Sequence, residues 1–98
     1  MTTRFKKQKV KLKGKAWDNQ KQKVYDRDNH TCQLCGRDVV VCECHHAIFR
    51  SQGGDDSMEN LITLCFSCHH AIHNGCKDAT KLRRLAERKL EEINGKAL

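Results

Sequence analysis

The sequence predicts a small α+β domain that a metal site holds together, and three observations support this. A chain of 98 residues has room for one domain with a small apolar core. Two Cys-x-x-Cys pairs, at Cys32/Cys35 and Cys65/Cys68, have the spacing typical of a structural zinc site. Apolar residues recur at helical spacing in some segments and form short β-branched runs in others.

A first helix is predicted from Trp17 to about Asp28, because Trp17, Val24 and Tyr25 lie seven and eight positions apart and share one face. The β-branched residues that begin at position 39 then predict a strand over residues 39 to 44. Gly53 and Gly54 mark a loop with unusual backbone angles. Residues 61 to 64, Leu-Ile-Thr-Leu, are expected to form the returning strand.

Two further helices are predicted after the second cysteine pair. A short one carries the histidines at 69, 70 and 73 and ends at Asn74-Gly75. Asp78 is expected to cap a last helix that ends at Asn94-Gly95. Its apolar residues recur at steps of three and four, as on the buried face of a helix: Leu82, Leu85, Ala86, Leu90 and Ile93.

The net charge of +7 is concentrated at the start of the chain. Residues 1 to 16 contain no acid and seven basic side chains, namely Arg4, Lys6, Lys7, Lys9, Lys11, Lys13 and Lys15. This composition predicts a flexible basic tail over residues 1–16, followed by a folded domain over residues 17–98. Such a tail favours a polyanion such as DNA as partner, although a solvated, solubilising end remains the alternative at this point.

The cysteines also indicate the compartment. The chain has seven of them, an odd number, and its start lacks the apolar stretch of a signal peptide. We therefore expect a cytoplasmic protein with reduced thiols and no membrane span, in which Cys32, Cys35, Cys65 and Cys68 share one structural Zn²⁺. Cys42, Cys44 and Cys76 are then left over, and are expected to be small buried or half-buried thiols.

Five of the six histidines gather around this cysteine frame. His45 and His46 lie between the two pairs, and His69, His70 and His73 directly follow the last cysteine. On a helix, residues 69 and 73 project from one face and can share a metal ion, whereas His70 points away. His30 and His70 are expected to be ordinary solvated or packed histidines.

These motifs together resemble the HNH endonuclease family. The resemblance covers residues 17 to 75 and rests on Cys32-x-x-Cys35, His45-His46, the Gly53-Gly54 loop, Asn60-Leu61 and Cys65-x-x-Cys68-His69-x-x-x-His73. It implies a ββα-metal (His-Me finger) domain with flanking helices. The three positions that name the family fall on His46, Asn60 and His69.

The resemblance also implies roles for these residues. His46 would be the general base, His45 and His69 would be ligands of a catalytic divalent metal, and His73 would be the third ligand. Asn60 would orient the loop that aims His46. Histidine at position 45 resembles the colicin-type branch and provides no anionic ligand, so Mg²⁺, Mn²⁺, Ni²⁺ and Zn²⁺ all remain candidates for the ion.

The expected activity is metal-dependent hydrolysis of DNA to 3′-hydroxyl and 5′-phosphate ends, with low intrinsic sequence specificity. Arg50 and the basic tail would contact phosphates, which gives salt-sensitive affinity but little reading of sequence. Compact members of the family resemble phage-encoded proteins, so phage packaging or recombination proteins are candidate partners, and the host cytoplasm would then be the location.

Two other functions remain open on the sequence. One is a non-catalytic zinc-ribbon module that binds DNA through the same cysteines and tail. The other is a structure-specific nuclease that acts on DNA junctions. A binding module has no need of adjacent histidines at 45 and 46 paired with His69 and His73, so this pairing favours the enzyme.

Overall fold

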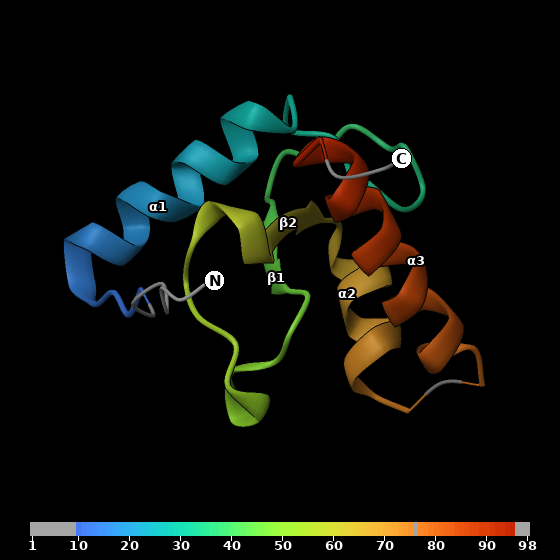
Figure 1. Cartoon of the computed structure of the whole chain (residues 1–98). Coiled ribbons are helices and arrows are strands. Elements are labelled where there is room, and N and C mark those ends of the chain that lie inside the picture. The colour runs from blue at the N-terminus through green and yellow to red at the C-terminus, as the bar shows by residue number, and fades with distance from the viewer. Residues whose placement is uncertain (1–9, 76, 96–98) are drawn as a thin grey trace.

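A computed structural model describes residues 10–75 and 77–95 of the chain (Figure 1). It contains a two-stranded antiparallel hairpin with helices on both sides, so the predicted α+β class is confirmed. The elements in order are α1 (Gly14–Arg27), β1 (Glu43–His46), the short 3-10 helices Arg50–Gln52 and Met58–Asn60, β2 (Leu61–Leu64), α2 (Phe66–His73) and α3 (Ala79–Ile93).

The hairpin is the centre of the fold. Glu43 pairs with Leu64 and His46 pairs with Leu61, which fixes the register of the whole hairpin. Side chains alternate between the two faces of a strand. In β2, Leu61 therefore packs with Val24 and Tyr25 of α1, whereas Ile62 belongs to the cluster formed with α2 and α3.

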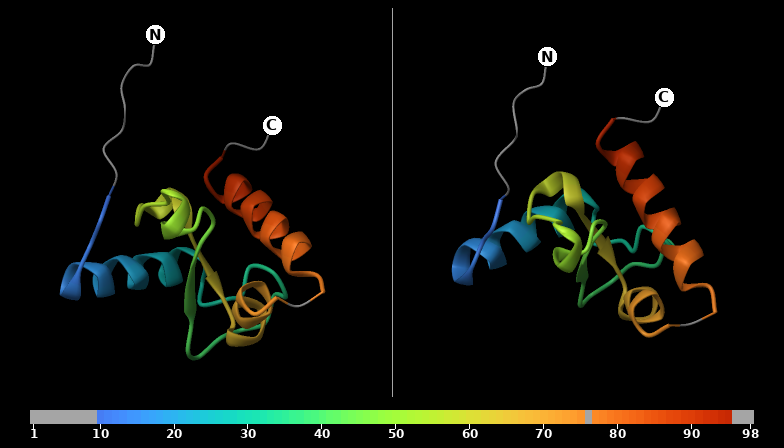
Figure 2. Two further views of the ribbon diagram at one scale, coloured as in Figure 1. Left: turned by 90° about the horizontal axis from the view of Figure 1, so that it is seen from below. Right: turned by 60° about the horizontal axis from the view of Figure 1, so that its bottom comes forward.

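Figures 1 and 2 show α1 on one side of this hairpin and α2 and α3 on the other. Two small apolar clusters result. The cluster on the α1 side contains Val24, Tyr25 and Leu61, and the cluster on the opposite side contains Cys32, Ala47, Ile62, Leu64, Cys65, Ile72 and Leu90. The core is divided in two by the hairpin, so neither half is large.

The first strand lies later in the chain than the sequence predicted. A strand was expected over residues 39 to 44, but β1 runs from Glu43 to His46. Val40 and Val41 are 98% and 74% exposed, and the Val39 N–H donates to the carbonyl of His30 in a loop instead. The β-branched run had no partner strand, and pairing with β2 decided where the strand lies.

The other elements agree closely with expectation. The second strand and the ends of α2 and α3 fall where the sequence predicted them, and Gly75 and Gly95 follow these helices with positive φ. Asp78 precedes α3, but its side chain makes no capping hydrogen bond. Gly54 packs so tightly that an added Cβ would lie 1.7 Å from the Ile48 carbonyl oxygen, which explains the need for glycine there.

The helix α1 begins at Gly14, three residues before the expected start at Trp17. Part of the expected flexible tail, residues 1 to 9, lies outside the described residues. The segment between this part and α1 is hydrogen-bonded to the loop before β2, since the backbone N–H groups of Val10 and Leu12 donate to Asp55 and Asp56. Among the described residues, no helix is both long enough and apolar enough to cross a bilayer.

A buried carboxylate joins α1 to the hairpin. Asp28, 5% exposed, accepts the backbone N–H of Thr63 at 3.0 Å and both side-chain nitrogens Nε and Nη2 of Arg27. The same guanidinium donates to the carbonyls of Met58 and Leu61. Because a buried charge is tolerated only when paired and hydrogen-bonded, this network fixes the position of α1.

The substitution Asp28→Ala should therefore destabilise the domain by about 1–3 kcal/mol, because it leaves the Thr63 N–H and the Arg27 guanidinium without their acceptor. Urea denaturation at a fixed zinc concentration measures the effect. The matched control is Asp18→Ala on the same helix, which removes an exposed pair with Lys21 and should cost less than about 1 kcal/mol. Equal destabilisation of the two variants would contradict this account.

Candidate functional site

The four cysteines of the two Cys-x-x-Cys pairs come together in one cluster. Their sulfur atoms all lie within 4.8 Å of one another, and the Sγ atoms of Cys35 and Cys65 are 3.9 Å apart. A tetrahedral zinc with Zn–S bonds of about 2.3 Å places sulfurs about 3.8 Å apart. The donor set and its spacing fit a structural zinc, and a closed shell of four sulfurs leaves no position for substrate.

Backbone N–H groups donate hydrogen bonds to the sulfurs of Cys65 and Cys32. The N–H of Cys68 donates to the Sγ of Cys65 at 3.4 Å, one turn into α2. Burial opposes ionisation of the Cys32 thiol, but N–H groups of Cys35, Cys65 and Leu34 hold its pKa at about 7. For Cys32 the fold itself therefore favours the thiolate, which is the form that binds zinc.

A second cluster consists of His45, His69 and His73, each of which offers a ring nitrogen within 4.8 Å of the others. His45 comes from β1 and is 1% exposed, while the other two project from α2. Within the described part of the chain, neither ring nitrogen of the buried His45 has a hydrogen-bond partner. A buried, unpaired imidazole is costly unless something binds it, and three imidazoles at this spacing fit a divalent ion.

The surroundings keep His45 in the form that can bind an ion. Burial, and then the nearby charges of His69 and His73, lower the pKa of His45 to about 3. Its ring is therefore neutral at ordinary pH and has a free lone pair. Burial also lowers the pKa of His73, with further contributions from His69 and Arg83.

Glu43 supports this cluster and is not among the site residues predicted from the sequence. Its Oε1 lies 3.0 Å from the Nδ1 of His69, which directs the Nε2 of that ring away from the carboxylate. Carboxylates in this position orient metal-binding histidines and raise their basicity. Glu43 and His45 are two residues apart in β1 and so share a face, a signal that the sequence contains.

His46 lies outside the three-histidine cluster. Because it is adjacent to His45 in a strand, its side chain projects from the opposite face, toward α1. Its Nε2 is 2.8 Å from Oδ1 of Asp56, and its ring stacks on Trp17 with centroids 5.6 Å apart. The side chain is 15% exposed. Asp56 and Trp17 are not among the site residues predicted from the sequence.

Asn60 closes the loop between the two strands. Its Nδ2 donates to the carbonyls of Ile48 and Asp55 at 3.1 and 2.9 Å, and its Oδ1 accepts the N–H of Ile48 at 2.8 Å. The side chain is buried. One amide thus bridges both ends of the loop that follows His46, which is the geometry expected of a residue that orients it.

The remaining predicted residues are distributed over the surface. Arg50 binds Asp56 and lies over the ring of Trp17. The lysines of the basic tail at positions 11, 13 and 15 are exposed, whereas Arg4, Lys6, Lys7 and Lys9 lie outside the described residues. His70 is exposed and contacts Asn74 within its own helix.

Of the leftover cysteines, Cys44 is half-buried, and burial raises its pKa to about 12, so it remains a thiol. Cys42 lies 3.7 Å from the Nδ1 of His30. Cys76 lies outside the described residues. Neither described thiol belongs to a metal cluster found among the described residues.

The fold and its two clusters define a ββα-metal domain with a four-cysteine cluster that fits a structural zinc. An antiparallel hairpin is followed by a helix with histidines, and the three-histidine cluster lies between them. The model of the family described as HNH endonuclease matches residues 32–75. This range includes both cysteine pairs and every histidine of the candidate site. The chain belongs to the HNH endonuclease family.

Two curated proteins are similar in sequence. One is "Anaredoxin" from Nostoc sp., 38% identical over 56 residues, which are 57% of this chain and 72% of that protein. The other is "Type IV methyl-directed restriction enzyme EcoKMcrA" from Escherichia coli, 33% identical over 71 aligned positions. That match takes up 53% of this chain and 26% of the restriction enzyme, so this chain spans about a quarter of its length.

The two clusters should respond differently to mutation. Cys65→Ser should unfold the domain, because structural zinc binding is coupled to folding. His69→Ala should leave the fold intact and lower affinity for a second ion by about 10-fold or more. Circular dichroism and metal stoichiometry by native mass spectrometry measure both effects. The control Cys42→Ser, outside either cluster, should retain fold and metal content. A well-folded Cys65→Ser protein would argue against the zinc site.

Proposed function

We propose that this domain is a metal-dependent DNA endonuclease that leaves 3′-hydroxyl and 5′-phosphate ends. The observation that carries the proposal is the pair of adjacent histidines on opposite faces of β1. His45 joins two histidines of α2 in a cluster that fits a divalent ion, and His46 lies outside that cluster. The proposed metal ligand His45 and the proposed base His46 are therefore neighbours in the chain. A phosphate held by the ion would lie close to the base, as attack by an activated water requires.

In this proposal His46 accepts the proton of the attacking water. It lies outside the three-histidine cluster, and an imidazole whose nitrogen carries a free lone pair can accept a proton from water. Water adds to phosphorus as the bond to the 3′ oxygen breaks. That oxygen takes a proton from solvent water to become the 3′-hydroxyl, and His46 later returns its proton to solvent. A divalent ion bound at the cluster would supply positive charge for the phosphate and the departing oxygen.

The remaining residues position these groups. His45, His69 and His73 would hold the ion, with Glu43 orienting His69 through the 3.0 Å contact. Asn60 would maintain the loop that follows His46 through its three hydrogen bonds to Ile48 and Asp55. Three imidazoles without a carboxylate suit Zn²⁺ or Ni²⁺ better than Mg²⁺, which narrows the four candidate ions.

Two basic surfaces support DNA as the substrate. The first is the lysine-rich segment before α1, whose described lysines are exposed. The second is the start of α3, where Lys77, Lys81, Arg84 and Arg88 line a shallow hollow. Lys81, Arg84 and Arg88 recur at steps of three and four and so share one face of α3, and Lys77 lies just before the helix. Contacts of this kind bind phosphates without reading bases.

His46→Ala should abolish cleavage of plasmid DNA while the fold and both metals remain, because the base belongs to neither metal cluster. Loss of a general base lowers the rate by about 10²–10⁴-fold. The control is His70→Ala, which removes an exposed histidine of α2 and should leave cleavage normal. The assay compares Mg²⁺, Mn²⁺, Ni²⁺ and Zn²⁺ on supercoiled, linear and junction DNA.

The assay also separates the rival functions. DNA binding without cleavage by any ion would favour a zinc-ribbon binding module, and cleavage restricted to junctions would favour a structure-specific nuclease. Loss of the second ion in His46→Ala would overturn the assignment of His46 as base.

The basic tail can be tested separately, provided that the cut spares residues 10 to 12, which bind the Asp55-Asp56 loop. Deleting residues 1 to 9 removes four of the seven tail cations. For every phosphate that the shortened tail no longer binds, the log-log salt slope of DNA binding should fall by about 0.9. At saturating DNA the rate should stay near the full value, since these lysines and arginine bind ground state and transition state alike. An unchanged slope would make the tail a solubilising end.

A further inference from the structure

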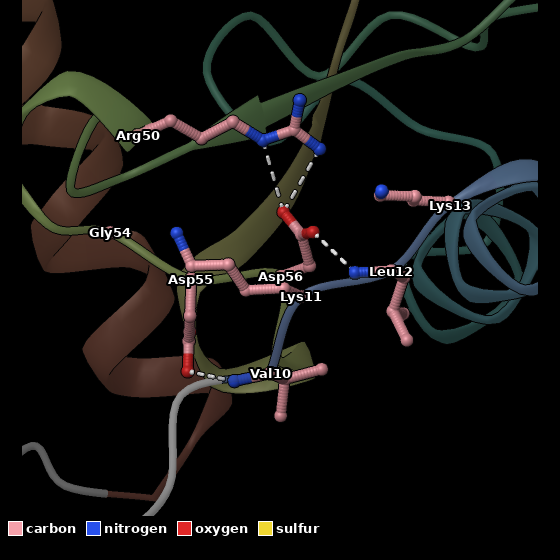
Figure 3. A pocket seen from close by; sticks show the side chains of 8 residues that line it. All are labelled: Val10, Lys11, Leu12, Lys13, Arg50, Gly54, Asp55 and Asp56. Atoms are coloured by element: carbon pink, nitrogen blue, oxygen red, sulfur yellow. Dashed lines mark hydrogen bonds and ion pairs between the residues drawn. The ribbon is translucent and has the colours of Figure 1, made fainter.

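Asp56 contacts four segments of the chain, and each of its polar atoms has a hydrogen-bond partner. Figure 3 shows two of these partners, Arg50 and Leu12, at the carboxylate. Asp56 is 4% exposed. Oδ1 accepts from the Nε2 of His46 at 2.8 Å and from Arg50 at 3.0 and 3.2 Å. Oδ2 accepts the N–H of Leu12 at 2.9 Å. Its backbone N–H donates to Val10 and its carbonyl accepts from Gln20 of α1.

The carboxylate of Asp56 is ionised. Burial on its own would raise the pKa of this side chain, but hydrogen bonds from Leu12, His46 and Arg50 together hold it below its ordinary value. An ionised carboxylate accepts hydrogen bonds and cannot donate them. In the bond between Asp56 and His46, the Nε2 of the histidine must therefore be the donor.

This donor assignment determines what His46 can do. A neutral imidazole carries one N–H and one lone pair, so a proton fixed on Nε2 leaves the lone pair on Nδ1. Stacking on Trp17 restricts rotation of the ring. A carboxylate that selects the tautomer of a histidine and fixes its orientation is also found behind the base of serine proteases.

Segments on both sides hold the carboxylate in this orientation. Residues 10 to 12 run alongside the loop, with Val10 bonded to Asp55 and Asp56, and Leu12 bonded to Oδ2. Figure 3 shows Arg50 approaching the same carboxylate from the opposite side. Asp56 is therefore fixed in place before any substrate binds.

We propose that Asp56 is the positioning residue of the base, which holds His46 with the proton on Nε2 and presents Nδ1 to the attacking water. The assignment of a base rests on the proposed function, whereas the tautomer is a property of the protein alone. An experiment can therefore refute the assignment of His46 as the base and leave its tautomer standing, or the reverse.

The first test reads the tautomer directly in the zinc-loaded full chain without DNA. Two-dimensional 15N–1H NMR distinguishes an imidazole protonated on Nε2 from one protonated on Nδ1. The expected spectrum has His46 as the Nε2–H form. A spectrum with His46 as the Nδ1–H form would overturn the proposal, and it would do so without any variant. The Nε2–H form in a protein that cleaves no DNA would refute the proposed function and leave the tautomer assignment standing.

The second test uses Asp56→Asn. Leu12 and His46 bond to different oxygens of Asp56, and an amide replaces one of these oxygens with a donor NH2 group, so the variant cannot accept from both. The Nε2–H form should lose its preference in the NMR spectrum, and kcat at saturating DNA should fall by about 10- to 1000-fold with KM changed by less than about threefold.

The matched control is Asp55→Asn. The Asp55 carboxylate accepts hydrogen bonds from Val10 and from Ser57, its neighbour in the loop. The bond to His46 is made by Asp56. Asp55→Asn therefore measures how much kcat falls when the loop is loosened but the bond to His46 is kept. Its kcat and its tautomer should stay near those of the parent protein. If kcat falls equally in Asp55→Asn and Asp56→Asn and the tautomer is unchanged in both, Asp56 has only a structural role and the proposal is wrong. If Asp56→Asn does not fold, the spectrum of the parent protein decides the question.

Discussion

The arrangement of this domain depends on bringing four cysteine sulfurs to one point. The apolar core is divided by the hairpin into two small clusters, and a core of that size contributes little stability alone. The cysteine cluster joins the loop after α1 to the junction of β2 and α2. Because its last cysteine, Cys68, directly precedes His69 in the same helix, the cluster also sets the orientation of α2.

That orientation creates the histidine cluster. His69 and His73 lie one turn apart on α2, and the hairpin presents His45 to them from β1. The pairing of His45 with Ile62 places it on the side of the sheet that packs against α2. The same pairing places His46 opposite Leu61, on the side of α1. One strand therefore serves two sites, and a register shift of one residue would exchange the two histidines.

Much of this could be predicted from the sequence, because the informative features are local. Cys-x-x-Cys pairs, histidines four apart on a helix and glycines after helix ends depend on short spacings. The position of β1 could not be predicted in this way, because it depends on pairing with a strand about 20 residues later. Nor could Asp56: one aspartate in a polar loop resembles its neighbour Asp55, and only the fold shows which of them contacts His46.

His45 and His46 are the same residue type in two different surroundings. Burial, and then the charges of neighbouring groups, lower the pKa of His45, so its ring is neutral and has a free lone pair. His46 instead faces the carboxylate of Asp56, which accepts its N–H and leaves one nitrogen for the proposed proton transfer. In the proposed function the roles of ligand and base would be divided without a change of residue type, because the alternation of a β-strand sends adjacent side chains into two different surroundings.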